Sequence, residues 1–157
     1  MNIGHLKQVG NSEQQSLLLS GVLYLAAADS QSEQVLALEL PDRCELLVAT
    51  TAADASEQVQ GRRLLVILFD LAVEAEQWEA LAREFASPDC ELPVPLVALG
   101  EQLPGESALQ HMAALGVVDW IIGEQAGHLL EHKIRGLVRL QRRSEWVGRQ
   151  ARTLVES

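Results

Sequence analysis

The chain contains, at positions 63–70, the run Arg63-Leu64-Leu65-Val66-Ile67-Leu68-Phe69-Asp70. Six consecutive apolar residues precede the acid, whereas a strand with one solvated face alternates apolar and polar residues. We therefore expect a strand that is buried on both faces, at the centre of a parallel sheet covered by helices. Ligands of such open sheets bind beyond the carboxyl ends of the strands, so Asp70 is expected at the edge of a ligand crevice.

Strand-like and helix-like patterns alternate on both sides of this run. Further strands are expected at 21–27, 44–50, 94–99 and 117–122. One helix is expected to begin at Asp29 or Ser30, residue types that cap helix N-termini, and to stop before Pro41. Other helices are expected at 53–60, 74–85, 107–115 and from 126 to the end. This rhythm predicts an α/β fold, a doubly wound five-stranded parallel sheet with right-handed crossovers.

The composition is that of one folded domain. The chain has 157 residues, of which 48% are apolar, enough for a sizeable core. No apolar run approaches the about 20 residues that cross a membrane, and the N-terminus lacks the apolar stretch of a secretion signal. We therefore expect a cytoplasmic protein without membrane contact. Cys44 and Cys90 have no metal-ligand spacing and are expected to be reduced thiols.

Charge is distributed unevenly along the chain. The formal net charge is −10, yet residues 133–157 contain seven of the 12 Lys and Arg and two of the 22 Asp and Glu. The acidic remainder repels nucleic acid, so no direct contact with it is expected. The basic tail has Leu and Val at helical spacing, which favours a helix with cations near its C-terminus. Contact of these bases with phosphates is the alternative.

Three segments, in order and at suitable spacing, resemble the receiver domain of bacterial two-component response regulators. Residues 65–71 are similar to its third strand, which ends in the phospho-accepting aspartate, and 94–99 to its fourth. Residues 114–121 are similar to the run ALGAxDYL that enters its fifth strand. The resemblance covers about residues 21–140. It implies a flavodoxin-like fold with strand order 2-1-3-4-5 and a role in signal transduction or a phosphorelay.

The sequence departs from that family where the phosphorylation chemistry resides. The acid pair after the first strand is replaced by Ala26 and Ala27, with only Asp29 nearby. The family's Ser or Thr after the fourth strand is Gly100, and its lysine after the fifth strand is Gly123. Each lost ionic or hydrogen-bonded contact is worth about 1.5–3 kcal/mol. The sequence therefore predicts a degenerate pseudo-receiver in which Asp70 is a vestigial phospho-acceptor.

Other interpretations of Asp70 stay open. It is alternatively a solvated or helix-capping acid at the end of a strand. In a working phospho-receiver, Asp29 and Asp70 would together bind Mg²⁺, which prefers several oxygen ligands. No cofactor is expected otherwise. A small ligand such as a nucleotide, bound above Ala26, Asp70 and Gly100, is a further alternative because these small residues leave room.

No pattern in the sequence indicates catalysis. There is no Ser-His-Asp, Cys-His or HExxH arrangement and no phosphate-binding glycine loop with its lysine. His128 and His132 have the i, i+4 spacing of a metal pair, but no third ligand stands out, so a surface pair is favoured. We therefore expect neither an enzyme nor a metal site.

The last helix carries the stronger functional signal. Its apolar and small residues recur at spacings of three and four, at Leu137, Leu140, Ser144, Val147, Ala151 and Leu154. This is a weak heptad seam, and an isolated helix of this length is marginal in water. A homodimer through this helix and the neighbouring Trp120 is therefore expected. A frayed tail is the alternative.

Three segments make up the expected organisation: an arm at 1–20, a receiver-like domain at 21–140 and a helical linker at 141–157. By analogy with similar linkers, the module is expected to control an attached output domain through protein–protein contact. A diguanylate cyclase or phosphodiesterase and a transcription regulator are the candidates for that output.

Overall fold

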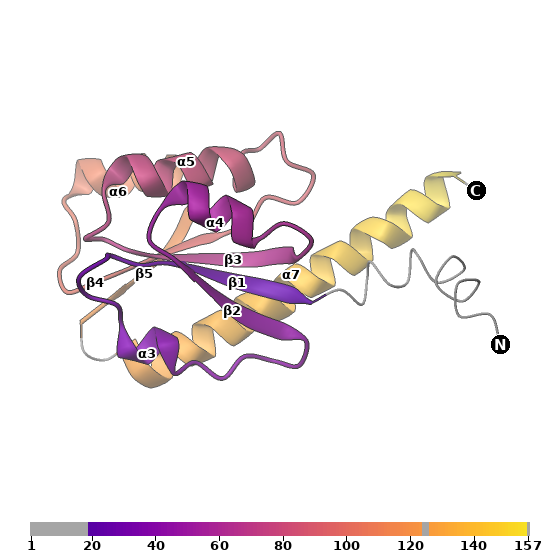
Figure 1. Ribbon diagram of the computed structural model, residues 1–157. Helices are drawn as coiled ribbons and strands as arrows, with labels where there is room; N and C mark the ends of the chain where they lie inside the picture. The colour runs from indigo at the N-terminus through magenta and orange to yellow at the C-terminus, as the bar shows by residue number, and fades with distance from the viewer. Residues whose placement is uncertain (1–18, 124–125, 157) are drawn as a thin grey trace.

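The computed structural model describes residues 19–123 and 126–156, with side chains at 19–123 and 128–144. Five parallel strands form one sheet in the order β2-β1-β3-β4-β5 (Figure 1). This confirms the predicted fold and strand order. The strands are β1 (Ser20–Leu25), β2 (Cys44–Ala49), β3 (Arg63–Asp70), β4 (Leu96–Gly100) and β5 (Val117–Ile122).

Helices cover both faces of this sheet (Figure 1). One face carries α4 (Ala52–Gln58), α5 (Ala75–Phe85) and α6 (Glu106–Ala114), and the other carries α3 (Glu33–Leu36) and α7 (Ala126–Glu156). Residues 65–69 of β3 are all buried, and residues 66–69 alternate between the two apolar clusters that the helices close. The central run is therefore apolar throughout because each of its faces has a helical layer to pack against.

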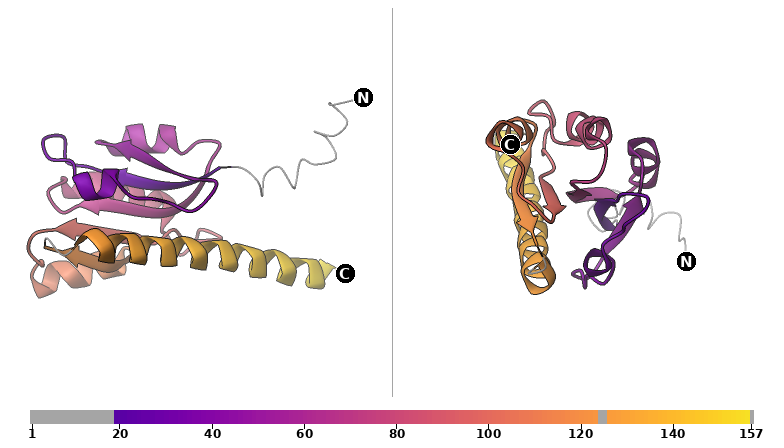
Figure 2. Two further views of the ribbon diagram at one scale, coloured as in Figure 1. Left: turned by 90° about the horizontal axis from the view of Figure 1, so that it is seen from below. Right: turned by 90° about the vertical axis from the view of Figure 1, so that its left-hand side faces the viewer.

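The long helix α7 packs through one stripe of its surface. Leu130, Ile134 and Val138 follow one another at intervals of four residues and are at most 1% exposed, as expected for one face of a helix. The helix has 31 residues, and its C-terminal half extends well beyond the sheet (Figure 2). None of the helices in residues 19–123 and 126–156 combines the length and apolar composition needed to cross a membrane.

The first predicted helix is far shorter than expected. Instead of starting at Asp29 or Ser30 and reaching Leu40, α3 has four residues, and its N-cap is Ser32. The segment 37–43 takes the place of the remainder of the predicted helix, and side chains of α7 hydrogen-bond to it. Arg135 donates to the Glu39 carbonyl at 3.0 Å, and Arg142 donates to the Asp42 carbonyl at 2.9 Å. These bonds give two carbonyls of the segment the partners that backbone polar groups require.

The edge strand β5 contains one residue without a partner in β4. Leu96 pairs with Val117, but Val97 pairs with Asp119, so Val118 is an extra residue in the ladder. Its side chain is 55% exposed. Next to it, Asp119 binds Lys133 of α7 at 2.8 Å. The irregularity therefore lies where the sheet edge is tied to the long helix.

Truncation of Ile134 to alanine is expected to destabilise the fold. Ile134 lies on the buried face of α7 and is fully buried. Such a truncation in a core costs about 2–5 kcal/mol of stability. The matched control is Leu140→Ala on the same helix, because Leu140 is 58% exposed and surface changes stay within about 0.5 kcal/mol. Chemical denaturation of dilute protein measures the free energy of unfolding of both variants. Equal losses would contradict the observed orientation of α7.

Candidate functional site

The acid that ends β3 is held by hydrogen bonds from β1 and the loop after it. The Tyr24 hydroxyl donates to the Asp70 carboxylate, at 2.9 Å from Oδ1 and 2.7 Å from Oδ2. The backbone N–H of Ala27 donates to Oδ2 at 3.1 Å. Both oxygens of this half-buried carboxylate are thus engaged with the protein itself.

The register of the sheet brings Tyr24 to Asp70. Tyr24 pairs with Leu68 across β1 and β3, and side chains on a strand return to the same face every second residue. Asp70 is therefore the diagonal neighbour of Tyr24 on the face covered by α3 and α7. The Tyr24 side chain is fully buried, and its hydroxyl also accepts from the Ser32 N–H at 2.9 Å. The network thus connects β3, β1 and the N-cap of α3.

Burial sets the electrostatics of this pair. It raises the pKa of Asp70 above its ordinary value, and the hydrogen bonds from Tyr24 and Ala27 lower it in part. Burial also raises the pKa of Tyr24, opposed by the Ser32 N–H and reinforced by the nearby Asp70 charge. At neutral pH the tyrosine is therefore a neutral donor.

Gly100, which stands where the resemblance implies Ser or Thr, is closely covered by Leu71. A Cβ atom built at Gly100 would lie 2.6 Å from Leu71 Cδ1 and 3.2 Å from Leu71 Cβ. Real Cβ atoms do not approach so closely, so any larger residue here requires Leu71 to move. Leu71 thus fills space that the hydroxyl side chain would occupy.

Gly123, which stands where the resemblance implies lysine, has a backbone conformation suited to glycine. Its φ is +86°, a region that side chains other than glycine adopt at a cost. Its N–H donates to the Gly100 carbonyl at 2.9 Å. The C-terminal end of β5 is thereby hydrogen-bonded to the C-terminal end of β4. A lysine at position 123 would have a strained backbone.

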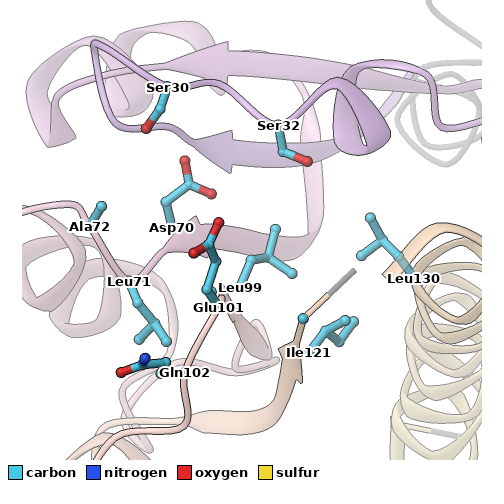
Figure 3. Close-up of a pocket in the computed structure, with 12 residues that line it drawn as sticks. Ser30, Ser32, Asp70, Leu71, Ala72, Leu99, Glu101, Gln102, Ile121 and Leu130 are labelled. Atoms are coloured by element: carbon cyan, nitrogen blue, oxygen red, sulfur yellow. The ribbon is translucent and has the colours of Figure 1, made fainter. Parts of the chain in front are cut away.

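A pocket of about 600 Å³ opens beside Asp70, at the carboxyl ends of the strands (Figure 3). The residues that line it are Ser30, Ser32, Asp70, Leu71, Ala72, Leu99, Gly100, Glu101, Gln102, Ile121, Gly123 and Leu130. A crevice is thus present above Asp70 and Gly100, but Ala26, which was expected beside them, does not line it. Its lining comes from β3, β4, β5, the loop before α3 and the first turns of α7.

The remaining candidates for a phosphorylation site are dispersed. Ala26 is fully buried in the core, and Ala27 meets Asp70 through its backbone. Asp29 lies in an exposed turn and does not line the pocket. The pair Asp29 and Asp70, expected as the weak Mg²⁺ candidate, therefore does not share the pocket lining.

The residues expected to form a dimer interface lie in different environments. Trp120 is half-buried against the cluster under α4, α5 and α6, and its buried Nε1 has no hydrogen-bond partner among the described residues. Leu137 packs partly against the opposite cluster, whereas Leu140 is 58% exposed. The side chains of Val147 and Leu154 lie outside the described residues, as does most of the expected 1–20 arm.

The histidines and cysteines form no recognisable centre. His128 and His132 are exposed, and His111 binds Glu79 at 2.7 Å on the opposite face. Within residues 19–123 and 128–144, no three His, Cys, Asp or Glu side chains come close enough to hold a metal ion. Cys44 and Cys90 are free thiols.

Tyr24 is the site residue that the sequence interpretation missed. The run 21–27 predicts a buried strand, and a buried tyrosine hydroxyl ordinarily has a hydrogen-bond partner. That signal calls for a polar residue near Tyr24 but does not identify it. The strand order and the register of β1 against β3 identify Asp70.

Comparison of the sequence with protein-family models and with curated proteins gives no match. Comparison of the structure gives response regulators. A two-component response regulator from Clostridium difficile aligns with a TM-score of 0.54 at 12% identity, over 76% of this chain and 96% of the other. The phosphorylated cyanobacterial phytochrome response regulator RcpA aligns with a TM-score of 0.54 at 17% identity, over 75% and 90%.

The Legionella pneumophila response regulator LqsR is also similar. It aligns with a TM-score of 0.57 at 14% identity, over 85% of this chain but 48% of its own length. At these identities the likeness concerns the fold. The chain therefore has the receiver fold of response regulators, with Asp70 at the end of its third strand.

Replacement of Tyr24 by phenylalanine is expected to destabilise the protein by about 1–3 kcal/mol. The variant leaves the Ser32 N–H without its acceptor and removes a donor from Asp70, and unsatisfied buried groups cost about this much. In a double-mutant cycle, Tyr24→Phe and Asp70→Ala are expected to couple by about 0.5–3 kcal/mol.

The control for this cycle pairs Tyr24→Phe with Glu57→Gln, an exposed position on α4. Denaturant unfolding measures the free energy of unfolding of every variant in the two cycles. Because residues that share no partner are additive within about 0.5 kcal/mol, the control pair should show no coupling. Additivity of the Tyr24 and Asp70 variants would contradict the network.

Proposed function

We propose that this chain is a cytoplasmic signalling module with a receiver fold that regulates an attached output domain without phosphorylation of Asp70. It is not an enzyme; it acts by protein–protein contact through α7. The observation that carries the proposal is the engagement of both Asp70 oxygens by Tyr24 and Ala27. These protein donors bind the carboxylate that phosphorylation would use and lower the nucleophilicity of its oxygens.

Phosphoryl transfer to a carboxylate requires a free oxygen nucleophile and positive charge around the transferred group. The Tyr24 hydroxyl donates to both oxygens, which makes each a weaker nucleophile. The residues that line the pocket include two acids, Asp70 and Glu101, and no Lys, Arg or His among those the structure describes. Nothing in that lining stabilises the developing negative charge.

Asp29, which was expected to share Mg²⁺ with Asp70, does not line the pocket. This ion takes near-octahedral oxygen ligands and is usually bound by one or two carboxylates with waters. Asp70 already accepts from Tyr24 and Ala27, and Asp29 is outside the lining. The hydrogen bonds of Asp70 within the fold therefore support its interpretation as a structural acid.

The contacts of α7 support its role as the output element. Through Arg135 and Arg142 it holds the segment 37–43, and Glu131 of α7 accepts from the Glu39 N–H at 3.2 Å. That segment continues from α3, whose N-cap Ser32 binds Tyr24. A continuous chain of hydrogen bonds and backbone thus leads from Asp70 to the helix that extends past the domain.

Dimerisation through α7 is the proposed mode of action. Leu140 is 58% exposed on α7, and it belongs to the heptad pattern that continues towards the C-terminus. An exposed apolar residue on a repeat of this kind pairs with a second helix in coiled coils. A second copy of the chain provides such a helix.

Phosphoryl mimicry is expected to leave the protein unchanged. We expect Mg²⁺ with beryllofluoride to cause no shift of the backbone NMR signals of residues 70–73, because the Tyr24 hydroxyl donates to the Asp70 carboxylate. The Asp70→Asn variant is the control, since shifts present in both proteins do not arise at the carboxylate. Saturable shifts in the wild-type protein alone would contradict a phosphorylation-independent module.

Substitution of Leu140 by glutamate is expected to dissociate the dimer. Sedimentation velocity on the full chain should give a dimer for the wild type and a monomer for Leu140→Glu, because a charge in a heptad seam repels its copy. The matched control is Leu36→Glu, on an apolar residue of α3 that is 46% exposed, which should stay dimeric. A monomeric wild type, or a dimeric Leu140→Glu variant, would refute this interface.

A further inference from the structure

The pocket beside Asp70 is large and has an apolar wall. Its volume of about 600 Å³ lies within the range of small-molecule sites, about 300–1,000 Å³, and far exceeds what a metal ion needs. Leu71 and Ala72 line it with accessible apolar surface, whereas the lining residues Leu99, Ile121 and Leu130 are each at most 7% exposed. The apolar body of an organic ligand would therefore lose its hydration on binding here.

The polar residues of the pocket are acids and hydroxyls. Asp70 and Glu101 extend into it from the ends of β3 and β4, and Ser30 and Ser32 stand on the opposite side (Figure 3). The described lining contains no basic side chain. Two carboxylates without a compensating cation repel phosphates and carboxylates and attract a positive charge.

Asp70 retains the capacity to accept from a ligand. Among the residues that the structure describes, its Oδ1 accepts from Tyr24, whereas Oδ2 accepts from Tyr24 and Ala27. A carboxylate oxygen has two lone-pair sites. An ammonium or guanidinium group that donates to Oδ1 and to Glu101 would therefore complete this acid pair without displacing Tyr24.

We propose that this pocket binds a small organic cation, a primary ammonium or guanidinium group on a short apolar body. The charged group lies between Asp70 and Glu101, and the apolar body packs on Leu71 and Ala72. Only the consequence of binding, not the binding itself, rests on the proposed function. Leu130 belongs to α7 and Ser32 is the N-cap of α3, so such a ligand contacts both ends of the connection from Asp70 to the output helix.

The experiment is an NMR titration of the full chain with three probes of matched shape. The probes are 2-phenylethylamine, the neutral 2-phenylethanol and the anionic 3-phenylpropionate. The amine should give saturable shifts at residues 70–72, 99–102 and 121. The alcohol should bind about tenfold more weakly or worse, since a charge-assisted hydrogen bond contributes that much, and the acid should not bind.

Two variants locate the bound amine. Glu101→Gln keeps the shape of the pocket and should weaken amine binding about tenfold. Glu57→Gln removes an equally exposed acid on α4, away from the pocket, and should leave the affinity unchanged. Equal effects of the two variants would overturn the proposal, because the amine would then respond to the net charge of the protein. Equal binding of alcohol and amine would also overturn it.

Adenosine monophosphate serves as the competing probe. If it binds the pocket and the amine does not, the site is a nucleotide site and the proposal is wrong. If no probe binds while beryllofluoride leaves the spectrum unchanged, the cation site fails and the phosphorylation-independent module stands. If the amine binds and beryllofluoride also shifts the signals of residues 70–73, the cation site stands and the phosphorylation-independent module fails.

Discussion

The hydrogen bond between the Tyr24 hydroxyl and the Asp70 carboxylate is the contact on which the functional end of this molecule depends. It gives a buried phenol its acceptor and a half-buried carboxylate its donor, and both groups would be costly to leave unsatisfied. The same hydroxyl accepts from the Ser32 N–H, so it also sets where α3 begins. A chemical group that receivers use for phosphorylation is here part of the packing.

The second constraint is the attachment of α7 to a distant loop. Arg135 and Arg142 bind carbonyls about 100 positions earlier in the chain. The segment 37–43 is thereby hydrogen-bonded to α7 rather than continuing α3 as a helix. A displacement of α7 would release the carbonyls of 37–43, so the position of the helix and the order of that loop are linked.

Much of the fold was predictable from local patterns, and much of the site was not. The apolar run 64–69 predicts a central strand because burial on both faces removes the usual alternation, and Asp70 follows at its carboxyl end. The short α3 was not predictable, because residues 37–43 are held by arginines of α7 rather than by their own sequence. The hydrogen bond between Tyr24 and Asp70 depends on the register of β1 against β3. The contact of Leu71 with Gly100 depends on the pairing of β3 with β4, which brings the ends of the two strands together.

The extra residue in β5 has a consequence for how copies of this protein can meet. An edge strand offers unpaired backbone groups to any other strand, and β5 is one of the two edges of the sheet. At Val118 the ladder skips a residue, and bulges of this kind bend and twist the strand locally. An incoming strand would lose its register there, so growth of the sheet from one molecule into the next is disfavoured at this edge.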